Sequence, residues 1–372
     1  MSEGICFVSD TIHSYFNSRI ESGVGGAERQ QYMLATALRD RGYDVSVLTL
    51  KYGSTQRKTV DGIDVFCAIP DVRGVSRAPF KLIQTVRGLR SIDADVYYVR
   101  GNDFLCMATA SYACMSGGGF VYAVANDSNV DPALLESRGV LRYPYIRAMR
   151  SADTVVAQTS HQQQLLSEEH GIDAPIIPNG YDVPPESELI AHADREHVLW
   201  VGSMDPDQKR PERFLALARQ LPEIQFRMIG PPDNDHPDYS KKIAADARTL
   251  SNLDFLGFVD PDEIHDHYRD AIALVNTSDY EGFPNVFLEA WRYATPVVSL
   301  HHTLDGILID EPVGIHAGSM NALVEAIEQL AVDTSVCERL GFGGRRHMID
   351  HYAFDRLLDR YERVLTDVSR RN

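Results

Sequence analysis

Residues 278–291 read Ser-Asp-Tyr-Glu-Gly-Phe-Pro-Asn-Val-Phe-Leu-Glu-Ala-Trp, and they follow an apolar run at 272–276. The apolar run predicts a buried strand, and Pro284 suits the first turn of a helix that follows it. Gly282 allows a ligand to approach the backbone closely, and the unpaired N–H groups that begin a helix favour a phosphate. The stretch therefore predicts a strand, a ligand-binding loop and a helix, which together form the repeating unit of a parallel α/β sheet.

The same alternation of apolar strands and helices extends along the whole chain. We expect further strands at 5–9, 45–50, 96–99, 120–124, 154–157, 198–201, 226–229, 253–255 and 297–300, and helices at 27–41, 79–89, 131–150 and 211–220. Continuous apolar strands separated by helices are typical of parallel sheets that helices cover on both faces. The polar segment 181–188 carries two prolines and reads as a linker. The sequence thus predicts an α/β protein with two doubly wound domains that meet near residue 180 and bind a ligand in the cleft between them.

The charge of the chain is strongly acidic and unevenly spread. Among 372 residues, 53 are Asp or Glu and 36 are Lys or Arg, which gives a formal net charge of −17, and only six of the cations are Lys. Residues 1–180 hold 17 cations and 19 acids, whereas residues 181–372 hold 19 cations and 34 acids. This balance favours a salt-adapted, halophile-like source and argues against nucleic acid as a partner. The five scattered cysteines indicate a reducing compartment and show no metal-ligand spacing.

Two glutamates in the opening stretch are candidates for binding a ligand. Glu281 lies in the loop before the expected helix, and Glu289 lies within that helix beside Leu288, Ala290 and Trp291. A carboxylate in such apolar surroundings is costly unless it has a partner, and its two oxygens suit a sugar diol. The alternative is that Glu281 is an ordinary acid at a helix start and that Glu289 is exposed.

Lys209 and Arg210 are the best candidates for binding an anion in the acidic second half of the chain. Lysine acts on a phosphate as a point charge, and arginine can bind it through two N–H groups. The alternative is a solvated start of the helix 211–220.

The segment 280–290, in which Glu281 and Glu289 stand eight positions apart, resembles the E-x7-E motif of GT-B glycosyltransferases, closest to the retaining family-four group. Four further segments resemble that family, and the resemblance covers nearly the whole chain. They are Gly25-Gly26-Ala27-Glu28, Ile177-Pro178-Asn179-Gly180-Tyr181-Asp182, the stretch from Val201-Gly202-Ser203 to Lys209-Arg210-Pro211, and Leu256-Gly257-Phe258-Val259. The resemblance implies two Rossmann-like domains, an acceptor domain at 1–180 and a donor domain at 181–351. It also implies a C-terminal helix within 352–372 that packs back on the first domain.

The resemblance further implies transfer of a sugar from a nucleoside diphosphate to a glycan or lipid-linked acceptor, with retention of anomeric configuration and without a metal or other cofactor. Glu289 would hold the ribose of the donor, and Glu281 would lie near its sugar. Backbone amides of Gly282 and Phe283 would cradle the pyrophosphate, which Lys209 would neutralise. The remaining donor-side candidates are Gly202, Ser203, Arg210, Phe258, Val259, Pro284 and Asn285, and the acceptor-side candidates are Gly25, Gly26 and Glu28.

The chain departs from the family pattern at two places. Ser203 stands where many relatives carry the arginine of a Gly-Arg pair, and Arg210 is expected to compensate. The segment 121–129 lacks the histidine that many relatives place near the reacting sugar. Asn126 or Asp127 would occupy that place, and both are therefore counted with Glu281 as catalytic candidates.

Two windows of the first half, 72–92 and 139–152, carry arginine and lysine but no acid. In an acidic chain they favour contact with an anionic membrane through residues 73–90 and 138–150, or with a lipid-phosphate acceptor. The alternative is a pair of ordinary solvated helices. No run of about 18 apolar residues exists, and the N-terminus has no basic region typical of a signal peptide. A cytoplasmic protein at the inner face of the membrane is the resulting expectation.

Three alternatives to a transferase remain to be weighed. A nucleotide-sugar epimerase shares the GT-B architecture, and a glycan- or nucleotide-binding protein with a decayed site would explain Ser203 and the missing histidine. A dinucleotide-dependent dehydrogenase is disfavoured, because the glycines around Gly25 lie well after the first strand rather than in its turn.

Overall fold

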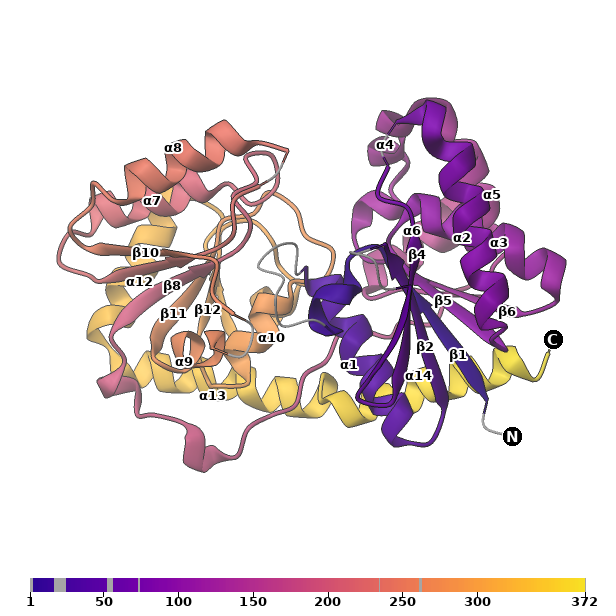
Figure 1. Cartoon of the computed structure of the whole chain (residues 1–372). Coiled ribbons are helices and arrows are strands. Elements are labelled where there is room, and N and C mark those ends of the chain that lie inside the picture. Colours follow the sequence, from indigo (N-terminus) through magenta and orange to yellow (C-terminus); the bar gives the residue numbers. More distant parts are fainter. Residues whose placement is uncertain are drawn as a thin grey trace. The chain divides into compact units, whose positions relative to one another are not determined.

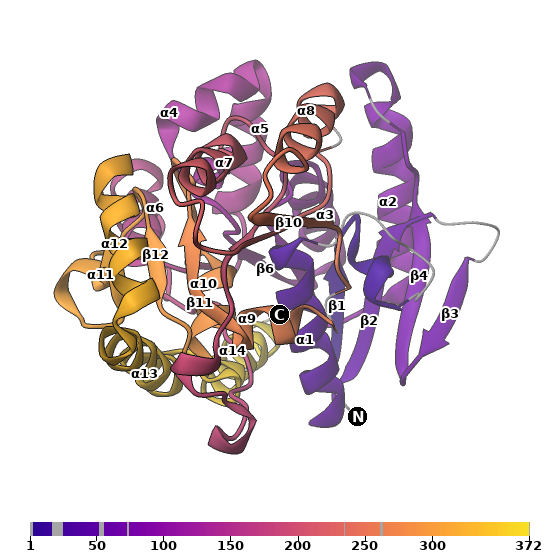
Figure 2. The ribbon, with the colours of Figure 1, turned by 90° about the vertical axis from the view of Figure 1, so that its left-hand side faces the viewer.

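The computed structural model describes residues 3–16, 25–51, 56–72, 74–233, 235–260 and 263–371. The chain divides into two compact units, of which unit 1 comprises Met1–Asn179 and Asp355–Asn372 and unit 2 comprises Gly180–Phe354. Each unit is built on one largely parallel sheet with helices on both faces, as Figure 1 and Figure 2 show. The α/β class with two doubly wound sheets is confirmed.

In the described part of unit 1, the sheet has seven strands in the order β3-β4-β2-β1-β5-β6-β7. Their bounds are β1 Gly4–Val8, β2 Asp44–Leu50, β3 Arg57–Val60, β4 Ile63–Ile69, β5 Val96–Arg100, β6 Gly119–Ala123 and β7 Thr154–Val156. β3 runs antiparallel to β4, and the other neighbours are parallel. The strand order reverses between β1 and β5, and ligands of such sheets bind beyond the carboxyl ends at this reversal.

The helices of unit 1 cover the two faces of this sheet. They are η1 Ile12–Phe16, α1 Gly26–Asp40, η2 Val75–Arg77, α2 Ala78–Ile92, α3 Asp103–Ser116, η3 Asp127–Asn129, α4 Pro132–Leu135, η4 Glu136–Leu141, α5 Arg142–Arg150, α6 Ser160–His170 and α14 Phe354–Ser369. Leu89 of α2, Leu105 of α3 and Tyr145 of α5 share one core cluster with Tyr97 of β5. On the opposite face, Tyr98 packs edge-on against Tyr361 of α14.

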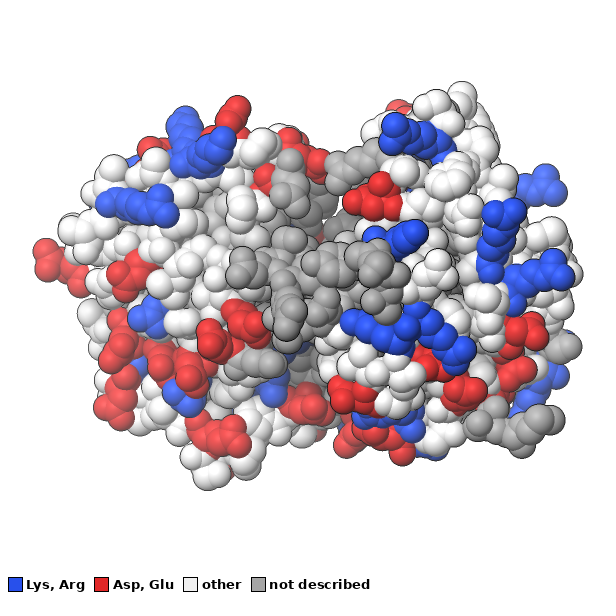
Figure 3. All heavy atoms as spheres, in the orientation of Figure 1, with Lys and Arg blue, Asp and Glu red and all other residues white. Residues whose placement is uncertain are grey.

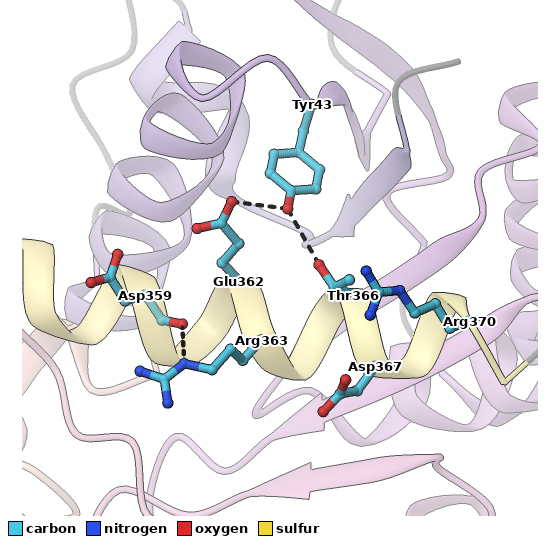
Figure 4. A pocket seen from close by; sticks show the side chains of 7 residues that line it. All are labelled: Tyr43, Asp359, Glu362, Arg363, Thr366, Asp367 and Arg370. Carbon is cyan, nitrogen blue, oxygen red and sulfur yellow. Dashed lines mark hydrogen bonds between the residues drawn. The ribbon is translucent and has the colours of Figure 1, made fainter.

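The C-terminal helix α14 returns to unit 1 and is held there by apolar and polar contacts. Its buried stripe consists of Leu357, Leu358, Tyr361, Leu365 and Val368. Its polar side borders a groove of about 530 Å³ (Figure 4). There the Tyr43 hydroxyl donates to Glu362 at 3.0 Å and lies 3.3 Å from Thr366 Oγ1, while Arg41 forms ion pairs with Asp359 and Glu362.

In the described part of unit 2, the sheet has six parallel strands in the order β10-β9-β8-β11-β12-β13. Their bounds are β8 His197–Val201, β9 Phe226–Ile229, β10 Leu253–Gly257, β11 Ala271–Asn276, β12 Val297–Ser299 and β13 Gly314–His316. The strand order reverses between β8 and β11. The loops after these two strands therefore flank the expected ligand site of unit 2.

The helices of unit 2 also form two layers. They are η5 Glu186–Glu188, η6 His192–Asp194, α7 Pro211–Gln220, α8 Pro237–Ala247, α9 Ile264–Arg269, α10 Asn285–Trp291, α11 Ile307–Asp310, α12 Met320–Val332 and α13 Thr334–His351. Helices α7, α8 and α12 contribute to one core cluster with the sheet. Gly344 lets α13 pack closely on α10. A Cβ at this position would lie only 2.2 Å from Cδ1 of Trp291, which belongs to α10.

The strands expected from the sequence agree with the structure to within one or two residues, but four elements differ. The sequence pattern missed the antiparallel pair β3–β4 and the short edge strand β13. The single helix expected at 131–150 is broken into α4, η4 and α5, because Gly139 adopts φ +56° and ψ −131°. None of the described helices is long and apolar enough to cross a bilayer.

Candidate active site

The site of unit 2 begins with two loops that leave the sheet at its reversal point. The first follows β8 and runs from Gly202 to Arg210, and the second follows β11 and runs from Thr277 to Pro284. Gly202 donates its N–H to Ile229 O at 3.1 Å. A Cβ on Gly230 would lie 1.7 Å from Gly202 O, so the loops after β8 and β9 need glycine to approach each other.

An ion pair joins the first loop to the second. Lys209 Nζ lies 2.7 Å from Oε1 and 2.9 Å from Oε2 of Glu281. Glu281 is 5% exposed, and the Lys209 side chain is 24% exposed. Two candidates that stand 72 positions apart in the sequence are thus brought into direct contact.

The carboxylate of Glu281 is surrounded by further donors. Ser278 Oγ donates at 2.6 Å and Asn276 Nδ2 at 3.3 Å to its Oε1, and Gln208 Nε2 lies 3.4 Å from Oε2. Burial alone would raise the pKa of Glu281, but the charge and hydrogen bonds of Lys209 and the bond from Ser278 outweigh it, so the pKa is lowered. Glu281 is therefore held as an anion, with its oxygens fixed at the carboxyl edge of the sheet.

Buried hydrogen bonds hold the two loops in register. Trp200 Nε1 donates to Thr277 Oγ1 at 2.9 Å, and Thr277 Oγ1 donates to Lys209 O at 2.7 Å. Asp279 N donates to Gln208 O at 2.9 Å. These bonds place Lys209 independently of its own ion pair.

Arg210 is already engaged by acids in this structure. It caps α7 with a left-handed backbone, φ +53°, and its Nε lies 2.9 Å from Glu212 and 3.7 Å from Asp279. Arg213, which the sequence reading passed over, lies 2.5 Å from the same Asp279. The site therefore holds three cations and three acids, whose formal charges cancel. The cations are Lys209, Arg210 and Arg213, and the acids are Glu212, Asp279 and Glu281. The expectation that Arg210 binds a diphosphate stays a prediction, and it requires these pairs to open.

Glu289 lies at the centre of α10 and is 6% exposed. The alternative of an exposed Glu289 is therefore wrong. The Tyr268 hydroxyl donates to Glu289 Oε2 at 2.8 Å. Tyr268 belongs to α9, a helix whose part in the site no sequence signal indicated.

The remaining donor-side candidates lie in loops at the same carboxyl edge. Gly282 and Phe283 are buried, and the Phe283 ring packs on Tyr352 at 5.3 Å. Pro284 caps α10 instead of opening its first turn, so Asn285 is the first helical residue. The last three, Ser203, Phe258 and Val259, follow β8 and β10 directly and are partly exposed.

In unit 1, the acceptor-side candidates lie at the start of α1. Gly25 is its N-cap, Gly26 its first residue, and Glu28 accepts a hydrogen bond from Thr11 Oγ1 at 2.7 Å. A Cβ on Gly25 would lie 2.4 Å from Glu28 Oε2, so glycine leaves room for this carboxylate to fold back. The preceding residues 17–24 lie outside the described residues.

The two catalytic candidates of unit 1 form a tight turn after β6. Asn126 accepts from Ser128 N at 3.0 Å and forms a capping box with Asn129. Asp127 Oδ1 accepts from Gln162 Nε2 at 2.9 Å. These bonds order the turn, and the catalytic roles of both residues stay predictions.

Lys81, which the sequence placed on a membrane-facing helix, lies inside unit 1 at the end of β1. Its Nζ is 3.6 Å from Asp10 Oδ2 and 4.8 Å from the centre of the Phe104 ring, and its side chain is 16% exposed. Asn102 Nδ2 donates to the same Asp10 oxygen at 2.9 Å. The expectation of membrane contact is thus wrong for Lys81, because Asp10 and Phe104 draw the ammonium group inward.

Comparison with protein families identifies the family to which the chain belongs. A family model described as "Glycosyltransferase Family 4" matches residues 24–184, and one described as "Glycosyl transferases group 1" matches residues 195–333. The chain belongs to the GT-B glycosyltransferases of group 1. Both family models describe transferases, and this favours a transferase over the epimerase alternative.

Curated relatives match part of their own length. The lipopolysaccharide core biosynthesis glycosyltransferase LpsE of Rhizobium meliloti is 26% identical over 188 residues, which are 48% of this chain and 52% of that protein. A D-inositol 3-phosphate glycosyltransferase of Mycolicibacterium vanbaalenii is 25% identical over 251 residues, which are 58% of this chain and 54% of that protein. The chain thus spans about half the length of these relatives.

Solved structures share the fold over the full chain. Sucrose-phosphate synthase from Thermosynechococcus elongatus has a TM-score of 0.79 at 18% identity and covers 100% of both chains. HepE of Anabaena, solved in complex with UDP and glucose, has a TM-score of 0.74 at 17% identity and covers 98% of this chain and 100% of its own. At these identities the likeness establishes the GT-B fold.

Proposed function

We propose that the protein transfers a sugar from a nucleoside diphosphate to an acceptor, with retention of anomeric configuration. The observation that carries the proposal is the buried ion pair of Lys209 and Glu281 in the loops at the reversal point of the second sheet, with Glu289 buried on α10, the helix that follows the second loop. A buried carboxylate held as an anion, a cation beside it and a second buried carboxylate on the next helix suit a ligand that has a sugar, a diphosphate and a ribose.

The donor would bind across the loops after β8 and β11. Glu289 accepts hydrogen bonds from the two ribose hydroxyls, and Lys209 turns from Glu281 toward the diphosphate. The backbone N–H groups of Gly282 and Phe283 face the same diphosphate. Ser203, Pro284 and Asn285 border it, and Phe258 and Val259 lie beside the base. A nucleoside diphosphate as the leaving group fits the UDP bound in HepE.

The acceptor would bind on unit 1, near Gly25, Gly26 and Glu28. A glycan or a lipid-linked glycan in surface-polysaccharide synthesis fits LpsE, a relative named for lipopolysaccharide core biosynthesis. In a single-step transfer with retention, the incoming hydroxyl attacks the face that the diphosphate leaves: the new glycosidic bond forms as the bond from the sugar to the diphosphate breaks, and a diphosphate oxygen takes the proton of the hydroxyl. Glu281 would orient the sugar, and Asn126 and Asp127 are the catalytic candidates that unit 1 supplies. This chemistry needs no metal.

A ligand screen tests the proposal. Both tryptophans, Trp200 and Trp291, lie in unit 2, so their fluorescence reports the unfolding of the unit that would hold the donor. UDP-, GDP- and ADP-hexoses are compared with their free sugars. A nucleotide sugar at 100 times its Kd stabilises the unit by about 2.7 kcal/mol. The absence of a shift with every nucleotide and nucleotide sugar would contradict the proposal.

Contact with an anionic membrane is a second part of the proposal. On α2, Phe80 and Ile83 are 52% and 51% exposed, and Arg87 lies one turn further along. A cavity of about 780 Å³ lies beside this helix, and its lining includes Phe80, Arg87, Lys51 and Arg57. Apolar side chains beside unburied cations suit a phospholipid headgroup and its first methylene groups.

The second expected membrane segment has the same character. Val140 and Tyr143 are 79% and 63% exposed, and Arg142, Arg147 and Arg150 line a cavity of about 640 Å³. Figure 3 shows Lys and Arg side chains (blue) on the right-hand side of unit 1, while Asp and Glu (red) gather on the lower parts of both units. Arg73 lies outside the described residues, and Arg138 is paired with Asp103.

Vesicle flotation tests this contact with vesicles of phosphatidylcholine and 30% phosphatidylglycerol. Each arginine near an anionic surface contributes about 1 kcal/mol, so the double variant Arg142→Gln and Arg147→Gln should bind about 30-fold more weakly. The matched control is Lys241→Gln with Lys242→Gln on α8 of unit 2. Equal flotation of the two double variants would refute the contact.

A further inference from the structure

His302 lies in the loop after β12, at the same carboxyl edge as Glu281, and the sequence reading gave it no role. The loop has an unusual backbone, because Leu304 and Asp305 adopt φ +51° and +54°, where side chains are rarely found. The His302 ring stands edge-on to Phe287 of α10 at 6.1 Å. A constrained loop thus holds an imidazole against Phe287 of α10 and within the field of Glu281.

Besides Arg210 Nε, two buried polar atoms at this edge have no hydrogen-bond partner among the described residues. They are Nε2 of His302 and Oγ of Ser299, the last residue of β12. Buried polar atoms are nearly always paired in folded proteins, with protein, water or ligand. His302 faces Glu281 and Lys209 of the proposed donor site, and a ligand bound there can supply the missing partner of its Nε2.

The charges around His302 come from several elements. The groups that face it are Glu281, Asp305, Lys209 and His316. Burial lowers the pKa of His302, as do Lys209 and His316, while Glu281 and Asp305 oppose the shift. The ring is therefore neutral near pH 7, with one nitrogen that donates and one that accepts.

We propose that His302 contacts the transferred sugar and selects among donors by hydrogen bonding to one of its hydroxyls. This inference rests on the proposed function and names the group recognised: a hydroxyl of a neutral hexose. Glu281 and Asp305 face the imidazole, and Lys209 turns to the diphosphate when the donor binds, so the surroundings favour hydrogen bonds to a neutral sugar. A uronic acid would meet Glu281 and Asp305 and is disfavoured.

The test uses the full chain and the hexose donor with the highest turnover among UDP-, GDP- and ADP-hexoses, together with its 2-, 3-, 4- and 6-deoxy analogues. His302→Ala should lower kcat/KM for the parent donor about 2- to 10-fold, the effect of one neutral hydrogen bond. For one deoxy analogue, the wild type and His302→Ala should be equal, because the bond is already missing. The Kd of the free nucleoside diphosphate should not change.

His302→Phe is the matched control, because it keeps the ring beside Phe287 and removes both nitrogens. It should show the same loss as His302→Ala, whereas a packing role predicts wild-type kinetics. The inference is overturned if His302→Ala matches the wild type with the parent donor, or if its loss is equal across all deoxy analogues. A wild type that binds no nucleotide and turns over no donor would instead contradict the proposed function, and the inference with it.

Discussion

Lys209→Met tests the pairing on which the donor site depends. The substitution leaves Glu281, which is 5% exposed, without the Nζ that now lies 2.7 and 2.9 Å from its oxygens. Removing one partner of a buried ion pair costs about 3–5 kcal/mol. Lys209 retains some exposure, and Ser278 and Asn276 still donate to the carboxylate. We therefore expect unit 2 to lose about 2–3 kcal/mol of unfolding free energy at pH 7.

The pH dependence of this loss has a definite sign. In the wild type, the pKa of Glu281 lies below its usual 4.5, so the pair stabilises the fold above that value and loses its effect as the pH falls through the folded pKa. Without Lys209, burial of Glu281 is opposed only by its remaining hydrogen-bond donors, and its pKa rises relative to the wild type. The deficit of Lys209→Met against the wild type should therefore shrink as the pH falls from 7 toward 4.

Urea unfolding followed by tryptophan fluorescence measures the effect, because Trp200 and Trp291 both lie in unit 2. Lys241→Met is the matched control, since the Lys241 side chain is 79% exposed and its ion pair is with the exposed Asp238. Its effect should stay within about 0.5 kcal/mol. The reasoning is refuted if Lys209→Met is as stable as Lys241→Met at pH 7, or if its deficit grows as the pH falls.

Three further outcomes are expected. Glu289→Ala should weaken nucleoside diphosphate binding by about 1.5–3 kcal/mol in calorimetry, whereas Tyr268→Phe, which removes one hydrogen bond to Glu289, should weaken it less. Burial lowers the pKa of His192 and His197 to about 4, so the folded state binds fewer protons than the unfolded state below pH 6.5. Unit 2 should then lose about 2 kcal/mol per histidine between pH 7 and pH 5 in urea unfolding, and His197→Gln should reduce this dependence. Tyr43→Phe should speed hydrogen exchange in α14 by removing about 1 kcal/mol of hydrogen bonding, and unchanged exchange would contradict the holding role of Tyr43.

The strands and their assembly into two doubly wound domains were accessible from the sequence because apolar runs mark buried parallel strands directly. Strands β3 and β4 escaped because they form an edge pair, in which β4 alternates buried and half-buried residues instead of forming one apolar run. Gly139 breaks the helix at 131–150 with a backbone angle that periodicity does not reveal.

Part of the candidate site could be predicted from the sequence. The spacing of Glu281 and Glu289 and the family resemblance indicated both glutamates, but no pattern indicated that Lys209 pairs with Glu281 across 72 positions. Tyr268 and His302 lie far from the site motif in the sequence and come near it only when the chain folds. The residues next to them in the sequence therefore give no sign of a role in the site. Lys81 looked like part of a basic surface because its partner Asp10 lies far away in sequence, at the end of another strand.

The most direct test of the account is a crystal structure of the protein soaked separately with UDP, GDP and ADP. We predict density for one nucleotide at the reversal point of the second sheet, with its ribose hydroxyls on Glu289 and its diphosphate within reach of Lys209. A nucleotide bound elsewhere, or a diphosphate that leaves Lys209 on Glu281 and approaches neither loop, would contradict the assignment of this site.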